Sequence, residues 1–147
     1  MRLHTASEVI SLTRLLENES AEIYEQLCRV GKHEEELRGF AKENQRYITL
    51  VQRAYNNVIS DAFEGGFAFD IEADDFSLNP TGIGNFQEVI KGVVAIENTL
   101  TNLYSIAAEQ SKSLLPDVSR VFNMITRKRK ERVDKLSQFL SPVSDIP

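Results

Sequence analysis

Two glutamates in this 147-residue chain stand where a carboxylate could take part in chemistry. Glu17 is followed seven residues later by Tyr24. Glu97 and Tyr104 repeat this pair eighty positions further along. Seven residues are close to two turns of an α-helix, so each Glu and Tyr pair shares one helix face. Both glutamates fall within apolar stripes, where an unpaired carboxylate is costly to bury. We expect each to have a partner; the alternative is that it reaches water from the edge of its stripe.

Four helical segments would have to position these residues. Apolar residues recur along each segment at the spacing of one face of an α-helix. Thr5 with Glu8, and Asn85 with Glu88, are residue types that cap a helix N-terminus, and Pro116 opens the last segment. The expected helices cover about residues 6–30, 33–62, 85–112 and 117–140, with a connection over about residues 63–84.

The lengths of the connections indicate how the helices are joined. The connections near Gly31 and Pro116 are short, and short links produce antiparallel helix hairpins. The middle connection, of about 22 residues, can stretch along a helix of about 25 residues, which is roughly 37 Å long. Two hairpins joined by one crossover form the ferritin-like arrangement. We therefore predict one all-α domain over residues 1–147, a ferritin-like antiparallel four-helix bundle with a long crossover between the second and third helices. The alternative is a mobile linker between two loosely associated hairpins.

The repeated Glu and Tyr pair also carries a family resemblance. Glu followed at seven residues by Tyr, on the first helix of each hairpin, resembles rubrerythrin-like members of the ferritin-like superfamily, over about residues 7–140. In that family the second and fourth helices each add a Glu-x-x-His motif. The six side chains hold a di-iron or related site that handles peroxide, dioxygen or iron. The resemblance implies that Glu17 and Glu97 would be the ligands from the first and third helices.

The Glu-x-x-His motifs themselves are missing from this sequence. The aligned window on the second helix reads Asn44-Gln-Arg-Tyr47. The aligned window on the fourth helix reads Arg129-Lys-Glu-Arg132. In this register both motif histidines are absent, and so are both motif carboxylates.

A shifted register does not restore the motifs. It places Glu43 and Arg46 on the second helix and Glu131 and Asp134 on the fourth, and again brings no histidine. The helical period disfavours this register, because the apolar stripes run through the unshifted positions. The only two histidines of the chain, at positions 4 and 33, lie far from the middle of the expected bundle.

The charges of the aligned residues indicate which groups could neutralise the two glutamates in place of metal ions. Two guanidiniums, Arg129 and Arg132, would neutralise the carboxylates of Glu17 and Glu97. The planar fork of arginine can meet a carboxylate with two hydrogen bonds, and amide and hydroxyl groups can complete the network. We predict a salt-bridged bundle centre without a cofactor, made of Glu17, Tyr24, Asn44, Tyr47, Glu97, Tyr104, Arg129 and Arg132. The alternatives are that both arginines point outward to water, and that Glu17 and Glu97 hold iron or another divalent metal.

Composition argues against several other function classes. A net charge of −5 argues against nucleic acid as a partner. The basic run Arg127–Arg132, with Lys135 nearby, is expected to be a solvated face, because its bases spread around the helix. The longest apolar run, Val93–Ile96, has four residues, so we expect no membrane span, no secretory signal and a cytoplasmic protein.

These observations favour a structural or binding module that has lost di-iron binding. The alternatives are a metal-dependent oxidoreductase or iron-handling protein with an altered site on Glu17 and Glu97, and a protein that binds a small ligand in the space left by the ions. We expect a homodimer, from the bundle architecture and from four aromatic residues of the connection that would pack against the bundle or face a second subunit. These residues are Phe63, Phe67, Phe69 and Phe76.

Overall fold

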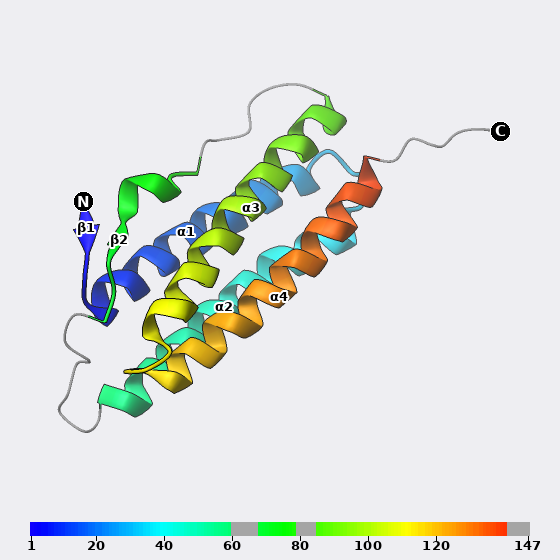
Figure 1. Cartoon of the computed structure of the whole chain (residues 1–147). Helices are drawn as coiled ribbons and strands as arrows, with labels where there is room; N and C mark the ends of the chain where they lie inside the picture. The colour runs from blue at the N-terminus through cyan, green and yellow to red at the C-terminus, as the bar shows by residue number, and fades with distance from the viewer. Residues whose placement is uncertain (60–67, 79–84, 141–147) are drawn as a thin grey trace.

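Four long helices make up most of the structure, a computed structural model that describes residues 1–59, 68–78 and 85–140 (Figure 1). The helices are α1 (Ala6–Cys28), α2 (Glu34–Ile59), α3 (Phe86–Ser111) and α4 (Pro116–Phe139). The described part of the connection between α2 and α3 contains a 3-10 turn, η1 (Ala73–Phe76). The predicted all-α class with four helices is confirmed.

The N-termini of α1 and α3 are closed by the expected capping boxes. The hydroxyl of Thr5 accepts a hydrogen bond from the amide of Glu8 at 3.2 Å, and the carboxylate of Glu8 accepts one from the amide of Thr5 at 3.1 Å. Asn85 and Glu88 repeat this arrangement at α3, with distances of 2.9 and 3.4 Å. Each box satisfies amides that the first turn of a helix leaves without a partner.

The turn between α1 and α2 uses two residues with left-handed backbone. Gly31 has a φ of 85°, and its amide donates to the carbonyl of Cys28 at 3.1 Å, so α1 ends slightly earlier than predicted. His33 has a φ of 52°, which is uncommon for a residue with a side chain. Its ring stacks on Phe139 at 3.8 Å between centroids and lies 5.9 Å from the ring of Phe86. These contacts anchor the turn to the ends of the other two helices.

A short antiparallel sheet that the sequence did not predict joins the N-terminus to the connection between α2 and α3. Strand β1 (Arg2–Leu3) pairs with β2 (Ile71–Glu72), with Leu3 opposite Ile71. The amide of Phe69 adds a hydrogen bond to the carbonyl of His4 at 3.0 Å. Phe69 and Phe76 are buried, which matches the expectation that aromatic residues of the connection pack against the bundle. Phe63 and Phe67 lie outside the described residues.

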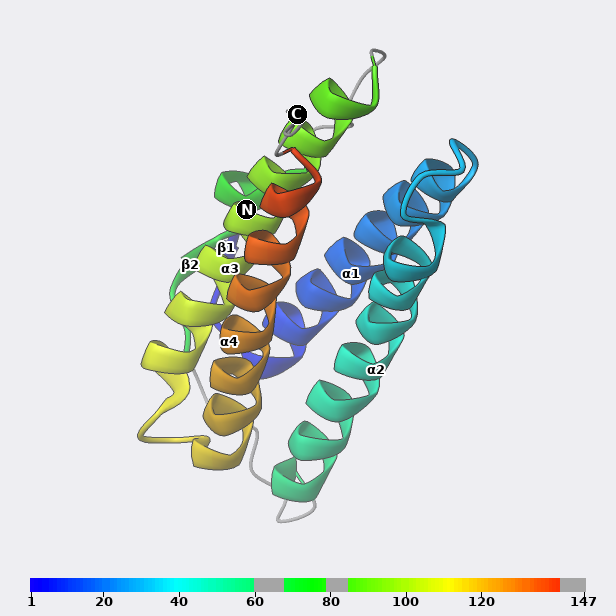
Figure 2. The same ribbon diagram turned by 90° about the vertical axis from the view of Figure 1, so that its right-hand side faces the viewer.

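The helices form two hairpins that lie against each other. α1 packs mainly on α2, and α3 packs mainly on α4 (Figure 2). Figures 1 and 2 show that α2 and α3 run in the same direction.

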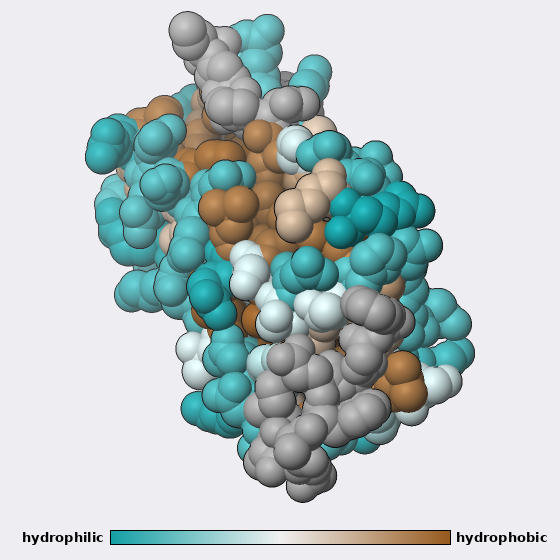
Figure 3. Space-filling view, turned by 90° about the vertical axis from the view of Figure 1, so that its left-hand side faces the viewer, coloured by the Kyte–Doolittle hydropathy of each residue, from teal (hydrophilic) through white to brown (hydrophobic). Residues whose placement is uncertain are grey.

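On the face that carries the small sheet, apolar side chains form a patch bordered by polar ones (Figure 3). No helix in the described ranges is both long and apolar enough to cross a membrane.

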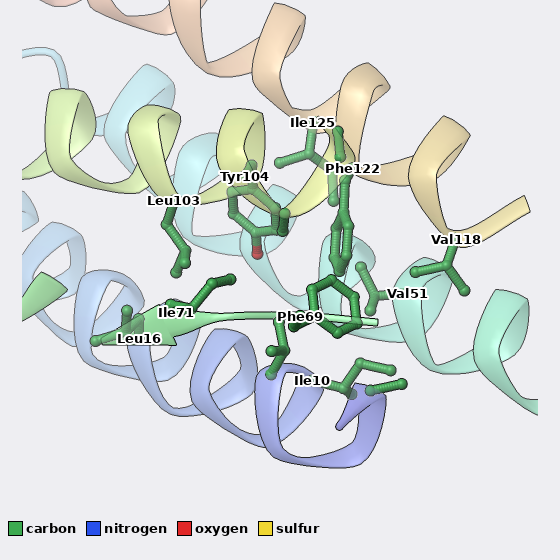
Figure 4. Close-up of a cluster of buried hydrophobic side chains, with 14 of the residues drawn as sticks. Ile10, Leu16, Val51, Phe69, Ile71, Leu103, Tyr104, Val118, Phe122 and Ile125 are labelled. Carbon is green, nitrogen blue, oxygen red and sulfur yellow. The ribbon is translucent and has the colours of Figure 1, made fainter. Parts of the chain in front are cut away.

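The core consists of two apolar clusters with the middle of the bundle between them. The larger cluster is built around residues such as Leu103, Phe122 and Ile125, and Figure 4 shows how these side chains converge with Phe69 and Ile71 of the connection. The smaller cluster lies towards the α1–α2 turn and includes Leu37, Ile90 and Leu136. Tyr104 belongs to the first cluster and Tyr24 to the second. The two clusters therefore enclose the polar residues of the bundle centre.

Candidate functional site

The guanidinium of Arg129 lies between the two glutamates that the sequence repeat singles out. Glu17 comes from α1, Glu97 from α3 and Arg129 from α4, and all three side chains are fully buried. One terminal nitrogen of Arg129, Nη2, donates to Glu17 Oε1. The other, Nη1, donates to Glu97 Oε1 at 2.6 Å. A single guanidinium group thus binds carboxylates from both hairpins.

The two tyrosines of the repeat cross over between the hairpins. The hydroxyl of Tyr24 on α1 donates to Glu97 Oε2 on α3. The hydroxyl of Tyr104 on α3 donates in turn to Glu17 Oε2 on α1. Each tyrosine therefore binds the glutamate of the other hairpin rather than the one seven residues before it. The sequence repeat becomes a reciprocal pair of hydrogen bonds that fixes how α1 and α3 face each other.

A second buried arginine extends the network towards the surface. Arg132 is 2% exposed, and its Nη1 donates to Asn44 Oδ1 at 2.8 Å and to Glu97 Oε2 at 3.2 Å. Its Nη2 donates to Glu43 Oε1 at 2.8 Å. The side chain of Glu43 is 37% exposed, so this bond lies at the edge of the bundle. Both arginines point inward, contrary to the alternative that they reach water.

Asn44 connects both arginines to α1. Its Oδ1 accepts from Arg132 and, at 3.3 Å, from Arg129. Its Nδ2 donates to the hydroxyl of Ser20 at 3.0 Å and to the backbone carbonyl of Glu17 at 3.2 Å. A side-chain amide suits this position because it offers an acceptor to the guanidiniums and donors to the neighbouring helix.

Tyr47 takes part through its ring. The centroid of the ring lies 5.4 Å from Cζ of Arg129 and 5.6 Å from Cζ of Arg132, which is the range of cation–π contacts. Its hydroxyl is buried and has no hydrogen-bond partner within the described part of the chain. The expectation that this hydroxyl completes the network by hydrogen bonding is therefore wrong. The ring of Phe40 makes a similar contact, with its centroid 4.8 Å from Cζ of Arg132.

Burial and paired charges act on the two carboxyl groups to different extents. Burial raises the pKa of Glu17 above its ordinary value, despite the opposing charge of Arg129. Burial also acts to raise the pKa of Glu97, but the charges of Arg129 and Arg132 outweigh it and the pKa is lowered. Burial likewise opposes the charge on Arg129, yet the two carboxylates raise its pKa well above the ordinary value. Glu97, which bonds to both guanidiniums, is therefore the more firmly ionised glutamate.

The histidines and the carboxylates of the shifted register do not bond to the buried network, with one exception. His4 lies beside the small sheet, where its Nδ1 is 3.2 Å from the carbonyl of Phe69, and His33 stacks at the α1–α2 turn. Glu131 and Asp134 are exposed on α4. The exception is Glu43, which precedes Asn44 and which the apolar period did not select, because it lies on the rim. The described residues contain no group of three or more His, Cys, Asp or Glu side chains that could hold a metal ion.

Replacing Arg129 with methionine should destabilise the protein strongly. Methionine fills part of the same volume but leaves Glu17 and Glu97 without their shared cation, and a buried charge that loses its partner costs about 3–5 kcal/mol. Urea unfolding followed by circular dichroism measures the loss. Arg127→Met is the matched control, because Arg127 is exposed on the same helix, and we expect it to change the free energy of unfolding by less than about 0.5 kcal/mol. Equal losses in both variants would contradict the buried ion pairs.

Raising the pH should unfold the protein as its buried tyrosines ionise. Burial raises the pKa of Tyr47 to about 12, and burial followed by a neighbouring carboxylate raises the pKa of Tyr24 and of Tyr104 well above the ordinary value. Tyrosines of the unfolded chain ionise near pH ~10, so the stability from these neutral phenols is present below that pH and is lost as the pH rises through the folded-state pKa values.

Tyrosinate absorbance in the near ultraviolet, recorded beside helical circular dichroism, tests this expectation. The absorbance of these three residues should appear together with the loss of helix. If they ionised at about pH 10 in a fully helical protein, the burial of the three phenols would be refuted.

Comparison with known proteins adds no independent assignment. No protein-family model, no curated protein and no solved structure matches this chain. A functional interpretation therefore rests on the side chains of the bundle centre and on their contacts.

Proposed function

We propose that this chain is a rubrerythrin-like domain of the ferritin-like type in which arginine takes the place of the metal ions. In this role it acts as a structural or binding module rather than as a di-metal oxidoreductase. The observation that carries the proposal is the position of the Arg129 guanidinium, which donates to both Glu17 and Glu97.

The carboxylate oxygens that a metal would need are already engaged. Glu17 accepts from Arg129 on one oxygen and from Tyr104 on the other. Glu97 accepts from Arg129 on one oxygen, and from Tyr24 and Arg132 on the other. An incoming divalent ion would have to displace hydrogen-bonded donors and approach two buried positive charges. These residues do not fit a di-iron centre, and we derive no redox step from them.

The charge balance supports the same view. Two buried carboxylates face two buried guanidiniums, so the centre is neutral without any added ion. Arg129 and Arg132 occupy the window where the family resemblance expects the Glu and the His of a Glu-x-x-His motif. In this proposal, guanidinium groups neutralise the glutamates of α1 and α3 where metal ions would do so in the family.

The arrangement of the helices supports the ferritin-like part of the proposal. α2 and α3 run in the same direction, as they do when one long connection returns along a bundle of two hairpins (Figure 1). Residues 68–78 of that connection lie beside the N-terminus through the pairing of β1 with β2. The homodimer and the cytoplasmic location expected from the sequence remain predictions.

Iron loading tests the proposed loss of metal binding. Protein purified without chelators would be incubated with ferrous iron in air, desalted and analysed for metals. We expect clearly substoichiometric iron, because Arg129 and Arg132 repel a divalent cation and occupy its ligands.

Two variants make the result specific. Glu17→Gln removes a candidate ligand, and Glu22→Gln removes an exposed carboxylate of the same helix. Near-stoichiometric iron that is lost in Glu17→Gln and kept in Glu22→Gln would overturn the proposal. It would favour an altered metal site on Glu17 and Glu97.

A further inference from the structure

A pocket between α2 and α4 lies directly outside the buried network. It has a volume of about 260 Å³ and is lined by Phe40 and Glu43 of α2 and by Lys128, Glu131, Arg132 and Lys135 of α4. The three basic residues are spaced by four and three positions, so they share one face of α4. Lys128 and Lys135 are exposed, as expected for a solvated face, whereas Arg132 departs from that expectation because it is buried.

Arg132 belongs both to this pocket and to the bundle centre. Its guanidinium reaches Glu97 and Asn44 on the inner side and Glu43 on the outer side. The inner partners are fully buried, whereas the Glu43 side chain is 37% exposed. The bond to Glu43 is thus the contact of Arg132 that water can most readily reach and that another anion can most readily replace.

Three cationic side chains line the pocket, and one of them, Arg132, is already paired with Glu97 and Glu43. Two carboxylates line it as well. Lys128 and Lys135 are exposed and form no ion pair with any residue that the structure describes. Nε of Arg132 is buried and has no hydrogen-bond partner in the same residues.

We propose that this pocket binds a small oxyanion, either a phosphate or a carboxylate. Lys128 and Lys135 pair with the anion from the rim, and the anion replaces Glu43 as the outer partner of Arg132. The ring of Phe40, 4.8 Å from Cζ of Arg132, forms an apolar wall that holds the guanidinium in place. Because arginine and lysine both recognise oxyanions, the same pocket can accept either chemistry.

This inference specifies the binding role within the proposed function and rests on it. Different experiments test the loss of metal binding and the oxyanion pocket, so either can be refuted without the other. Iron loading reports on the centre between Glu17 and Glu97, whereas oxyanion binding reports on the pocket outside Arg132.

Calorimetric titration of the whole chain with inorganic phosphate, and separately with citrate, tests the proposal at constant ionic strength and neutral pH. We expect saturable binding of at least one of them at a single site. Stronger binding of phosphate assigns the pocket to phosphorylated ligands, and stronger binding of citrate assigns it to carboxylates. Absence of saturable binding for both anions would overturn the proposal.

Two double variants separate the pocket from the general charge of α4. Lys128→Ala with Lys135→Ala should weaken binding about tenfold, because both rim cations are lost. Arg127→Ala with Lys130→Ala removes the same charge from exposed residues outside the pocket and should change affinity less than about twofold. Equal weakening in both double variants would overturn the proposal.

A third variant tests the replacement of Glu43. Glu43→Gln removes the competing carboxylate but keeps a side chain of the same size, so it should tighten oxyanion binding. Weaker binding in this variant would contradict the replacement. Circular dichroism of each variant verifies that the helices are intact, and all substituted residues lie at least partly exposed.

Discussion

The shared hydrogen bonding of Arg129 with Glu17 and Glu97 is the interaction on which the rest of the bundle centre depends. Moving two carboxylates and two guanidiniums out of water is costly, and their mutual attraction offsets that cost only when geometry and hydrogen bonding are good. Here each carboxylate oxygen of the two glutamates has a donor. Burial of these charges is therefore tolerable only with all four helices in place, since the donors come from α1, α3 and α4 and are oriented by Asn44 of α2.

Such a network constrains the arrangement of the helices, because its members come from all four of them. A buried ion pair is weak evidence of stabilisation, but the loss of one member is strongly unfavourable. The reciprocal bonds of Tyr24 and Tyr104 add a geometric requirement, because they form only when α1 and α3 are in the correct register. The apolar clusters on either side supply the burial, and a displaced packing would leave polar groups of the centre buried without their partners.

Much of this architecture was predictable from the sequence because helices leave strong local signals. Periodic apolar residues and the two capping boxes predicted the helices. The repeated Glu and Tyr pair identified four members of the centre, and the windows aligned with the expected Glu-x-x-His motifs supplied the other four. The small sheet was not predictable, since two-residue strands have no periodicity and depend on contacts between distant segments. Glu43 and the crossed partners of the tyrosines were missed for a related reason. Spacing along one helix assigns a residue to a face, but it does not determine which side chain of another helix it meets.

The central claim is that the guanidinium of Arg129 occupies the position between Glu17 and Glu97 that a metal ion would need. Crystallography at the iron absorption edge, on protein crystallised with ferrous iron, tests it most directly. The claim predicts density for Arg129 bridging the two carboxylates and no anomalous peak between them. An anomalous peak bound to Glu17 and Glu97, with the guanidinium of Arg129 turned away, would contradict it.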